Sequence, residues 1–410
     1  MEDELIDTDS LSLERKSKLP GKGFFYPDSL DEERREERAV EALEGAEAVI
    51  VTDSDADGLG CVALIREVYD AALDVVPFEE DLRERLADED DTDDGEADEE
   101  REESPVALLP SGPHSFEEDL GYVAEYLEAG TDVFVCDIST DAFEYVEDDL
   151  RTIVERAGSF RWFDHHQWDE GVEAAVRDLG IDLVVGDSEE ECSTDVTLRS
   201  LEYDFPERFT ELARVTRDHD LWLKEDERSD DVADYAYWTD AEEYVAVVGA
   251  YGVDLPEPVV EYITERRVEK ELLIEKAVER AEAHEVGDWR VGVTYGRCSQ
   301  NEVAEALRGQ GMDAAVIVKP AGSASIRGSE GFRRAHEVAG QVNGGGHPQA
   351  AGCKPDVYDD MLDYAHHWTT EGAATKRVIL AAFERVAEDA AADREGGTDG
   401  DGTDGDEPAE

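Results

Sequence analysis

The sequence of 410 residues has few cysteines and no pattern that would pair them. No two of them are spaced as CxxC, and their number is odd, which argues against a disulfide framework and against a zinc site with sulfur ligands. We therefore expect buried free thiols in a reducing compartment. The five cysteines are Cys61, Cys136, Cys192, Cys298 and Cys353.

Long apolar runs and a secretory leader are also missing. No run approaches the roughly 20 apolar residues that a membrane-spanning helix needs. The first residues, Met-Glu-Asp-Glu-Leu, lack the basic and apolar regions of a signal peptide. We therefore expect a cytoplasmic protein with no membrane partner.

Basic residues are scarce, since 38 Lys and Arg stand against 108 Asp and Glu and give a formal net charge of -70. The acids are spread along the whole chain, which is typical of adaptation to a cytoplasm rich in salt, where charges are strongly screened. The global charge therefore excludes no ligand, and a polyanionic substrate is compatible with it if metal ions and local basic groups receive it. With 40% hydrophobic residues, the chain is long enough for two domains with their own cores.

The remaining sequence is organised around residues 46–59. Residues 49–52 form a short, mostly apolar and β-branched run that predicts a buried strand. Asp53, Asp55 and Asp57 follow it, and Gly58 is expected to let the backbone turn into a helix beginning near residue 59. Three alternate carboxylates repel one another and are tolerable when a divalent cation lies among them. The alternative is an acidic surface turn.

Further strands alternate with helices along the first half of the chain, at 106–110, 131–136, 159–163 and 183–185. This alternation predicts βαβ units and an α/β fold with a mostly parallel sheet. Ligands of such sheets bind beyond the carboxyl ends of the strands. Acids and histidines that follow separate strands, or an apolar helix, should therefore meet at one edge. The group is Asp53, Asp55, Asp57, Asp137, His165, His166 and either Asp218 or Asp220.

Oxygen ligands together with one or two imidazoles suit Mn²⁺, and Mg²⁺ would also serve. The carboxylates are too many for one ion, so Asp137 could bridge two ions about 3.5 to 4 Å apart. Such a pair activates a water and stabilises the attacking and leaving oxygens at a phosphoryl centre. Of His165 and His166, we expect one to bind metal and the other to contact phosphate or protonate a leaving oxygen. Packing of the two histidines in the core is the alternative.

A second, smaller α/β domain is expected over residues 285–387, joined to a first domain at 31–225 by a linker at 226–284 that contains a long helix. Within the second domain, the Gly344, Gly345 and Gly346 run offers closely spaced backbone N–H groups for an anion. Arg327, which ends a short strand, and His347 add donors for phosphate.

Three acidic or basic segments stand apart from these domains. Residues 1–30 are expected to be irregular and to combine a basic cluster with aromatics, which suits a single nucleic-acid strand, or alternatively a tail that packs its aromatics on the domain. Residues 79–104 are dominated by Asp and Glu and are expected to be a disordered or solvated insertion. Residues 388–410 are expected to be a disordered acidic tail.

The motifs together resemble the DHH phosphoesterase superfamily. Asp-Ser-Asp-Ala-Asp-Gly at 53–58 resembles its first motif in the form of RecJ-type members, Asp137 the second, Asp164-His165-His166 the third and the Asp218 region the fourth. Residues 344–352 resemble the signature of the DHH-associated carboxyl-terminal domain. The resemblance implies that two Mn²⁺ or Mg²⁺ ions are bound by Asp53, Asp55, Asp57, Asp137, His165 and Asp218. It implies that substrate is contacted by His166, Arg327, Asn343, Gly344, Gly345, Gly346 and His347, and that Asp137, His165 and His166 act in catalysis.

The implied activity is that of a RecJ-like exonuclease that hydrolyses single-stranded DNA or RNA. A phosphodiesterase for short oligonucleotides or cyclic dinucleotides is the alternative enzyme, although the first motif differs from the His-containing form of those members. RecJ-like proteins of archaea can also associate with the GINS replication complex, so a replisome scaffold with weak activity is an alternative of another class. The complete set of acids argues against a scaffold.

Overall fold

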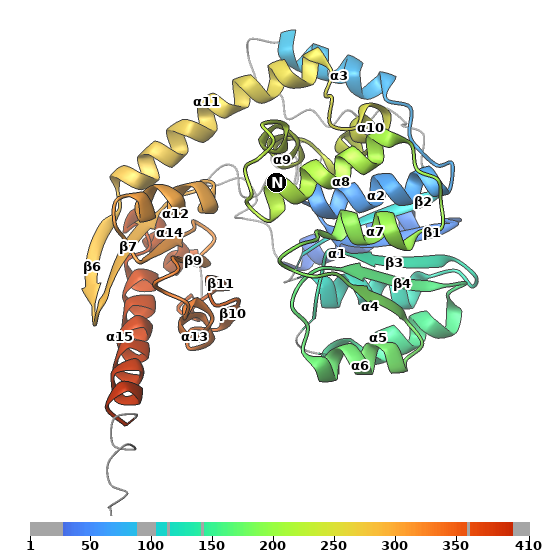
Figure 1. Cartoon of the computed structure of the whole chain (residues 1–410). Helices are drawn as coiled ribbons and strands as arrows, with labels where there is room; N and C mark the ends of the chain where they lie inside the picture. The colour runs from blue at the N-terminus through green and yellow to red at the C-terminus, as the bar shows by residue number, and fades with distance from the viewer. Residues whose placement is uncertain (1–27, 88–103, 113–114, 141–142, 359–360, 397–410) are drawn as a thin grey trace, which may run out of the picture. The chain divides into compact units, whose positions relative to one another are not determined.

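The structure is a computed structural model that describes residues 28–87, 104–112, 115–140, 143–358 and 361–396 (Figure 1). The chain divides into two compact units, and the division falls between Arg266 and Arg267, inside the long helix α11 (Glu257–Glu279). The basic cluster of the amino-terminal segment lies outside the described residues, as do 88–103 of the acidic segment and 397–410 of the tail. In the part of the chain that is described, no helix is long and apolar enough to cross a membrane.

The first unit is built on a five-stranded sheet in which every strand pair is parallel, so the predicted α/β class is confirmed. The strand order is β2-β1-β3-β4-β5, which places β3 at the centre between β1 and β4. All five carboxyl ends therefore lie along one edge of the sheet, as the sequence predicts. The strands are β1 (Ala48–Asp53), β2 (Val106–Ser111), β3 (Asp132–Cys136), β4 (Phe160–Asp164) and β5 (Asp182–Val185).

Helices cover both faces of this sheet, which explains why the strands are apolar on both sides. Along β1, Ile50 packs into one core and Val49 and Val51 into the other. Figure 1 shows α4, α5 and α6 on one side and α2, α7 and α8 on the other. The helices of this unit before α11 are α1 (Asp28–Leu43), α2 (Ala56–Val68), α3 (Val76–Ala87), α4 (Phe116–Tyr126), α5 (Phe143–Arg156), α6 (Glu170–Asp178), α7 (Ser193–Ser200), α8 (Glu207–Asp220), α9 (Arg228–Trp238) and α10 (Ala241–Tyr251).

Helices cover parts of the predicted acidic insertion, the predicted linker and the predicted tail. α3 covers the start of the predicted acidic insertion, because Phe78 and Leu82, four residues apart, form a buried stripe within it. α9 and α10 occupy the predicted linker and pack in the core of the first unit, which therefore extends to Arg266. The predicted tail begins inside α15 (Ala373–Gly396). In the first two segments a few buried apolar residues at helical spacing are enough to anchor an acidic sequence.

The second unit contains a six-stranded mixed sheet of order β10-β11-β9-β8-β7-β6, in which β7 and β8 are parallel and the other neighbours antiparallel. The three consecutive glycines at 344–346 form the edge strand β10. The strands are β6 (Glu282–Val286), β7 (Trp289–Tyr295), β8 (Ala314–Val318), β9 (Ala324–Gly328), β10 (Gly344–Gly346) and β11 (Ala350–Cys353). The helices other than α15 are α12 (Gln300–Gly309), α13 (Ala335–Gly340) and α14 (Met361–Thr369).

Candidate metal centre

The turn between β1 and α2 is fixed by its own aspartates. Asp53 is the last residue of β1, and Asp55 is the N-cap of α2, where its Oδ1 accepts hydrogen bonds from the backbone N–H groups of Asp57 (2.9 Å) and Gly58 (3.1 Å). This cap starts the helix at Ala56, three residues earlier than the sequence suggested. Asp57 therefore lies in the first helical turn and is 1% exposed.

Gly58 lies inside α2 and does not form the predicted turn. A Cβ atom at this position would lie 2.3 Å from the carbonyl oxygen of Asp53 and 2.5 Å from Oγ1 of Thr52. The glycine is therefore required because α2 packs directly against the end of β1. Its role is to bring the carboxylates of the turn close to the sheet edge.

Gly58→Ala is expected to lower the free energy of unfolding by about 1 to 3 kcal/mol, because the added methyl group overpacks a contact with backbone that cannot move aside. Gly121→Ala in α4 is the matched control, since its Cβ would meet no atom closer than 3.8 Å. Alanine favours a helix over glycine by up to about 1 kcal/mol, so this variant should be neutral or more stable. Denaturant titration of both variants measures the difference, and equal stability would contradict the packing argument.

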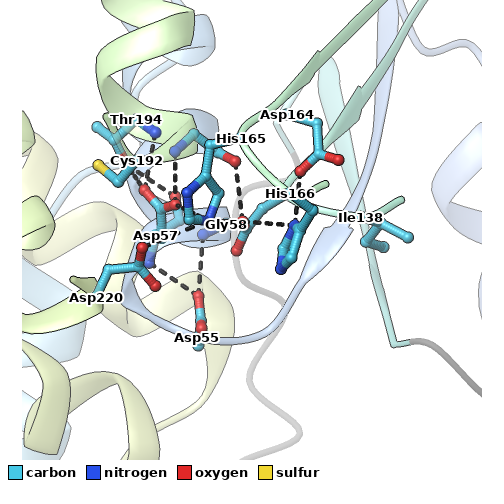
Figure 2. Close-up of polar contacts among 12 residues, drawn as sticks. Asp55, Asp57, Gly58, Ile138, Asp164, His165, His166, Cys192, Thr194 and Asp220 are labelled. Carbon is cyan, nitrogen blue, oxygen red and sulfur yellow. Dashed lines mark hydrogen bonds and ion pairs between the residues drawn. The ribbon is translucent and has the colours of Figure 1, made fainter. Parts of the chain in front are cut away.

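Asp137 and His165 follow β3 and β4 and meet at the same edge. Asp137 has a φ of 56°, a conformation that costs a non-glycine residue energy, and its N–H donates to the carbonyl oxygen of Phe163 (3.0 Å). The Nε2 atom of His165 lies 3.7 Å from Oδ1 of Asp137, 3.9 Å from Oδ2 of Asp57 and 3.4 Å from Oδ2 of Asp220. Figure 2 shows Asp57 and Asp220 turned toward the His165 ring.

These side chains form two overlapping groups that could hold a metal ion. One consists of Asp57, His165 and Asp220, and the other of Asp137, His165 and His166; in each, the potential ligand atoms lie within 4.8 Å of one another. The four elements that supply them are α2, α8 and the loops after β3 and β4. Segments far apart in sequence thus converge where the parallel sheet predicts.

Of the two acids left open by the sequence, Asp220 joins this cluster and Asp218 does not. Asp218 lies in α8 with its carboxylate bound to the following loop. It accepts hydrogen bonds from the backbone N–H groups of Glu225 (2.8 Å) and Asp226 (3.3 Å) and from the hydroxyl of Ser229 (2.7 Å). We therefore replace Asp218 with Asp220 as the candidate ligand.

The side chain of His166 pairs with that of Asp164, the first residue of the third motif. Its Nδ1 lies 2.8 Å from Oδ1 of Asp164 (Figure 2). Oδ2 of Asp164 accepts a hydrogen bond from Nε1 of Trp168 (2.7 Å). Burial lowers the pKa of His166, but the pairing with Asp164 outweighs it and raises the pKa to about 9. The same pairing, against the opposing effect of burial, holds the pKa of Asp164 below its usual value. The pairing with a buried carboxylate therefore orients His166 and favours its protonated form.

The start of α7 completes the site and was not found from the sequence. Ser193 and Thr194 hydrogen-bond the carboxylates of Asp57 and Asp137. The available signal was a pair of hydroxyl residues at the start of the helix that follows the last strand of the sheet. The sequence analysis assigned these residues no role.

The electrostatics of the cluster fit a divalent cation. Burial, followed by repulsion from Asp55, raises the pKa of Asp53 to about 7. Burial and then the charge of Asp57 raise the pKa values of Asp137 and Asp220 well above the ordinary range of a carboxyl group. Positive charge among these groups would relieve that repulsion. The donor set of carboxylate oxygens and imidazole nitrogen is one that Mn²⁺ accepts, and Mg²⁺ is compatible with its oxygens.

The substrate-binding residues predicted in the second unit lie on or beside β9 and β10, two strands that β11 separates in the sheet. Asn343 has a φ of 58° and precedes β10, and the N–H of His347 donates to the carbonyl oxygen of Ala350 (2.7 Å) to close the β10–β11 hairpin. A Cβ at Gly344 would lie 2.1 Å from the carbonyl oxygen of Gly352, so close strand packing explains this glycine by itself. The predicted anion site remains a prediction.

Arg327 lies on β9, where Ala350 of β11 pairs with it. Its Nε donates to Oδ1 of Asn301 (2.9 Å) and its Nη1 to the carbonyl oxygen of Ala351 (3.4 Å). Burial and then the nearby charge of Arg308 lower the pKa of the Arg327 guanidinium. The oxygens that these hydrogen bonds use belong to neutral groups, which leaves the positive charge of Arg327 available to an anion.

Comparisons with known proteins give no match in sequence: neither a family model nor a curated protein matches the chain. Solved structures do match. The DHH domain of a member of the s1p family of ribosomal proteins superposes with a TM-score of 0.51 at 14% identity, over 88% of this chain and 92% of that one. The chain therefore has the fold of a DHH-domain protein, as its motifs predict.

Two structures of the exonuclease RecJ are similar at lower scores. One, bound to manganese, has 14% identity and a TM-score of 0.44 over 84% of this chain and 94% of that one. The other, the Mn²⁺ complex from Thermus thermophilus, has 16% identity and a TM-score of 0.47 over 86% of this chain and 55% of that one.

Proposed function

We propose that the protein is a divalent-metal-dependent phosphodiesterase that acts as an exonuclease on single-stranded DNA or RNA. The observation that carries this proposal is the convergence of Asp57, Asp137, His165 and Asp220 at the carboxyl edge of a parallel sheet. The resemblance of the first motif to that of RecJ-type nucleases supports a nucleic-acid substrate over a smaller one.

The residues of the site have distinct roles in this proposal. Asp57, Asp137, His165 and Asp220 would hold the metal, with Asp53 and Asp55 beside them. Two Mn²⁺ or Mg²⁺ ions, when bound, would activate a water and stabilise charge at the phosphorus. His166, kept protonated by Asp164, is able to donate a hydrogen bond to a phosphate oxygen or a proton to the leaving oxygen. Arg327 and the β10–β11 hairpin of the second unit would bind further phosphates.

The test uses the full chain in concentrated KCl with Mn²⁺ and single strands of DNA and RNA labelled at either end. We expect release of mononucleotides from one end, with faster turnover on long strands than on dinucleotides or cyclic dinucleotides. Preferential turnover of the dinucleotides would instead support the alternative enzyme. A folded, Mn²⁺-binding protein that releases no nucleotide from any of these substrates would contradict the proposal.

A further inference from the structure

The first two residues of α7 hold two carboxylates of the metal centre. Asp57 accepts hydrogen bonds at Oδ2 from the N–H of Ser193 (2.7 Å) and at Oδ1 from the N–H (2.8 Å) and Oγ1 (2.7 Å) of Thr194. Asp137 accepts one at Oδ1 from the Ser193 hydroxyl (2.9 Å). Ser193 and Thr194 are fully buried. Figure 2 shows Thr194 against Asp57, on the side away from Asp220.

These contacts leave a defined part of each carboxylate available to a metal ion. Two donors lie at Oδ1 of Asp57, whereas its Oδ2 has one donor and lies 3.9 Å from Nε2 of His165. Oδ1 of Asp137 has the Ser193 hydroxyl on one side and Nε2 of His165 at 3.7 Å on another. Both carboxylates are therefore aimed at the same nitrogen by groups of one helix. Both carboxylates are buried, so the fixed donors replace water.

The close contact between α2 and α7 leaves just enough space for the hydroxyl of Thr194. A Cβ at Gly60, one turn after Asp57 in α2, would lie 2.5 Å from Oγ1 of Thr194. Any larger residue at position 60 would displace the hydroxyl from Asp57. The Thr194 hydroxyl also lies 2.9 Å from the carbonyl oxygen of Asp57, so it contacts this one residue at both side chain and backbone.

We propose that Ser193 and Thr194 are positioning residues of the metal centre, which set its affinity for a divalent cation by fixing Asp57 and Asp137 in their binding orientations. The inference rests on the proposed function, because it takes the cluster to be a metal centre. Residues that orient metal ligands in this way typically change metal affinity by about 10- to 100-fold when they are replaced.

The experiment measures the Mn²⁺ dissociation constant of the full chain by calorimetry in concentrated KCl. Thr194→Val, which keeps the shape and loses the hydroxyl, is expected to weaken binding by about 10-fold or more. Thr194→Ser keeps a hydroxyl and should bind within about 3-fold of the native protein, well below the 10- to 100-fold loss expected when the hydrogen bond is removed. Gly60→Ala, which pushes on the hydroxyl from α2, should weaken binding as Thr194→Val does.

Thr216→Val is the matched control, because Thr216 is a buried threonine of α8 whose Oγ1 has no hydrogen-bond partner among the described residues. It should bind Mn²⁺ as the native protein does. Native affinity in a folded Thr194→Val protein, or equal weakening in Thr216→Val, would overturn the inference and leave the proposed function standing. A native protein that binds no Mn²⁺ would overturn both.

Ser193→Ala decides the question if Thr194→Val does not fold. It removes a single side-chain hydrogen bond, the one to Asp137, and leaves the backbone N–H bond to Asp57 in place. Weaker Mn²⁺ binding with unchanged stability of the metal-free protein supports the positioning role. Native affinity in this variant overturns it.

Discussion

Replacing Asp137 with asparagine is expected to reduce Mn²⁺-dependent phosphodiester hydrolysis by on the order of 1,000-fold, since metal-ion catalysis contributes several kcal/mol and each 1.36 kcal/mol is a factor of ten. Asparagine keeps the size of the side chain and can still accept the hydrogen bond from Ser193. It removes the negative charge that lies 3.7 Å from His165. The loss should therefore come from metal binding and charge, and not from misfolding.

The comparison of kcat/KM between the native protein and Asp137→Asn checks this result, with circular dichroism as the measure of folding. Asp182→Asn is the matched control, because Asp182 is exposed at the first residue of β5, far from the carboxyl edge in the same sheet. It should keep native activity. An Asp137→Asn protein that retains activity would exclude Asp137 as a metal ligand, and an equal loss of activity in both variants would trace the effect to something other than the metal centre.

Asp220→Asn and Asp218→Asn are expected to have opposite consequences, although the two aspartates are two residues apart. Asp220→Asn should reduce activity by on the order of 1,000-fold, by the same reasoning on lost metal catalysis. The metal-free Asp220→Asn protein should be at least as stable as the native protein, because the substitution removes one of several buried carboxylates that repel one another. Burial, followed by this repulsion, raises the pKa of Asp220.

Asp218→Asn should instead lower the free energy of unfolding by about 1 to 3 kcal/mol. The substitution replaces one carboxylate oxygen with an NH2 group, which repels the donor whose hydrogen bond this oxygen accepts in the native protein. Its Mn²⁺ affinity should stay close to the native value. Unfolding in denaturant without metal and Mn²⁺ titration together separate the two variants. The reverse outcome, with Asp218→Asn losing metal and Asp220→Asn losing stability, would return Asp218 to the ligand set.

The sequence was sufficient to place Asp137, His165 and His166 at one edge, because residues that follow parallel strands share a position whatever the details of packing. It could not choose between Asp218 and Asp220. That choice depends on where α8 ends and on the loop that binds the Asp218 carboxylate through backbone N–H groups. Backbone donors have no sequence signature, and for the same reason the contacts of Ser193 and Thr194 with Asp57 were not predicted.

Acidic composition also concealed structure outside the site. Residues 79–87 and 228–245 have the composition of solvated segments, yet buried Leu82, Val232 and Tyr235 anchor them as helices. In a chain with a formal net charge of -70, charge density is therefore a weak guide to disorder. The spacing of the few apolar residues is the stronger signal.

The central claim is that acids and imidazole from α2, α8 and the loops after β3 and β4 form a single centre for two cations. Electron paramagnetic resonance of the full chain with two equivalents of Mn²⁺ in concentrated KCl tests this claim most directly. We predict the spin-coupled spectrum of a pair of ions about 3.5 to 4 Å apart, lost in Asp137→Asn and Asp220→Asn. Spectra of uncoupled or free Mn²⁺ in the native protein would contradict the account.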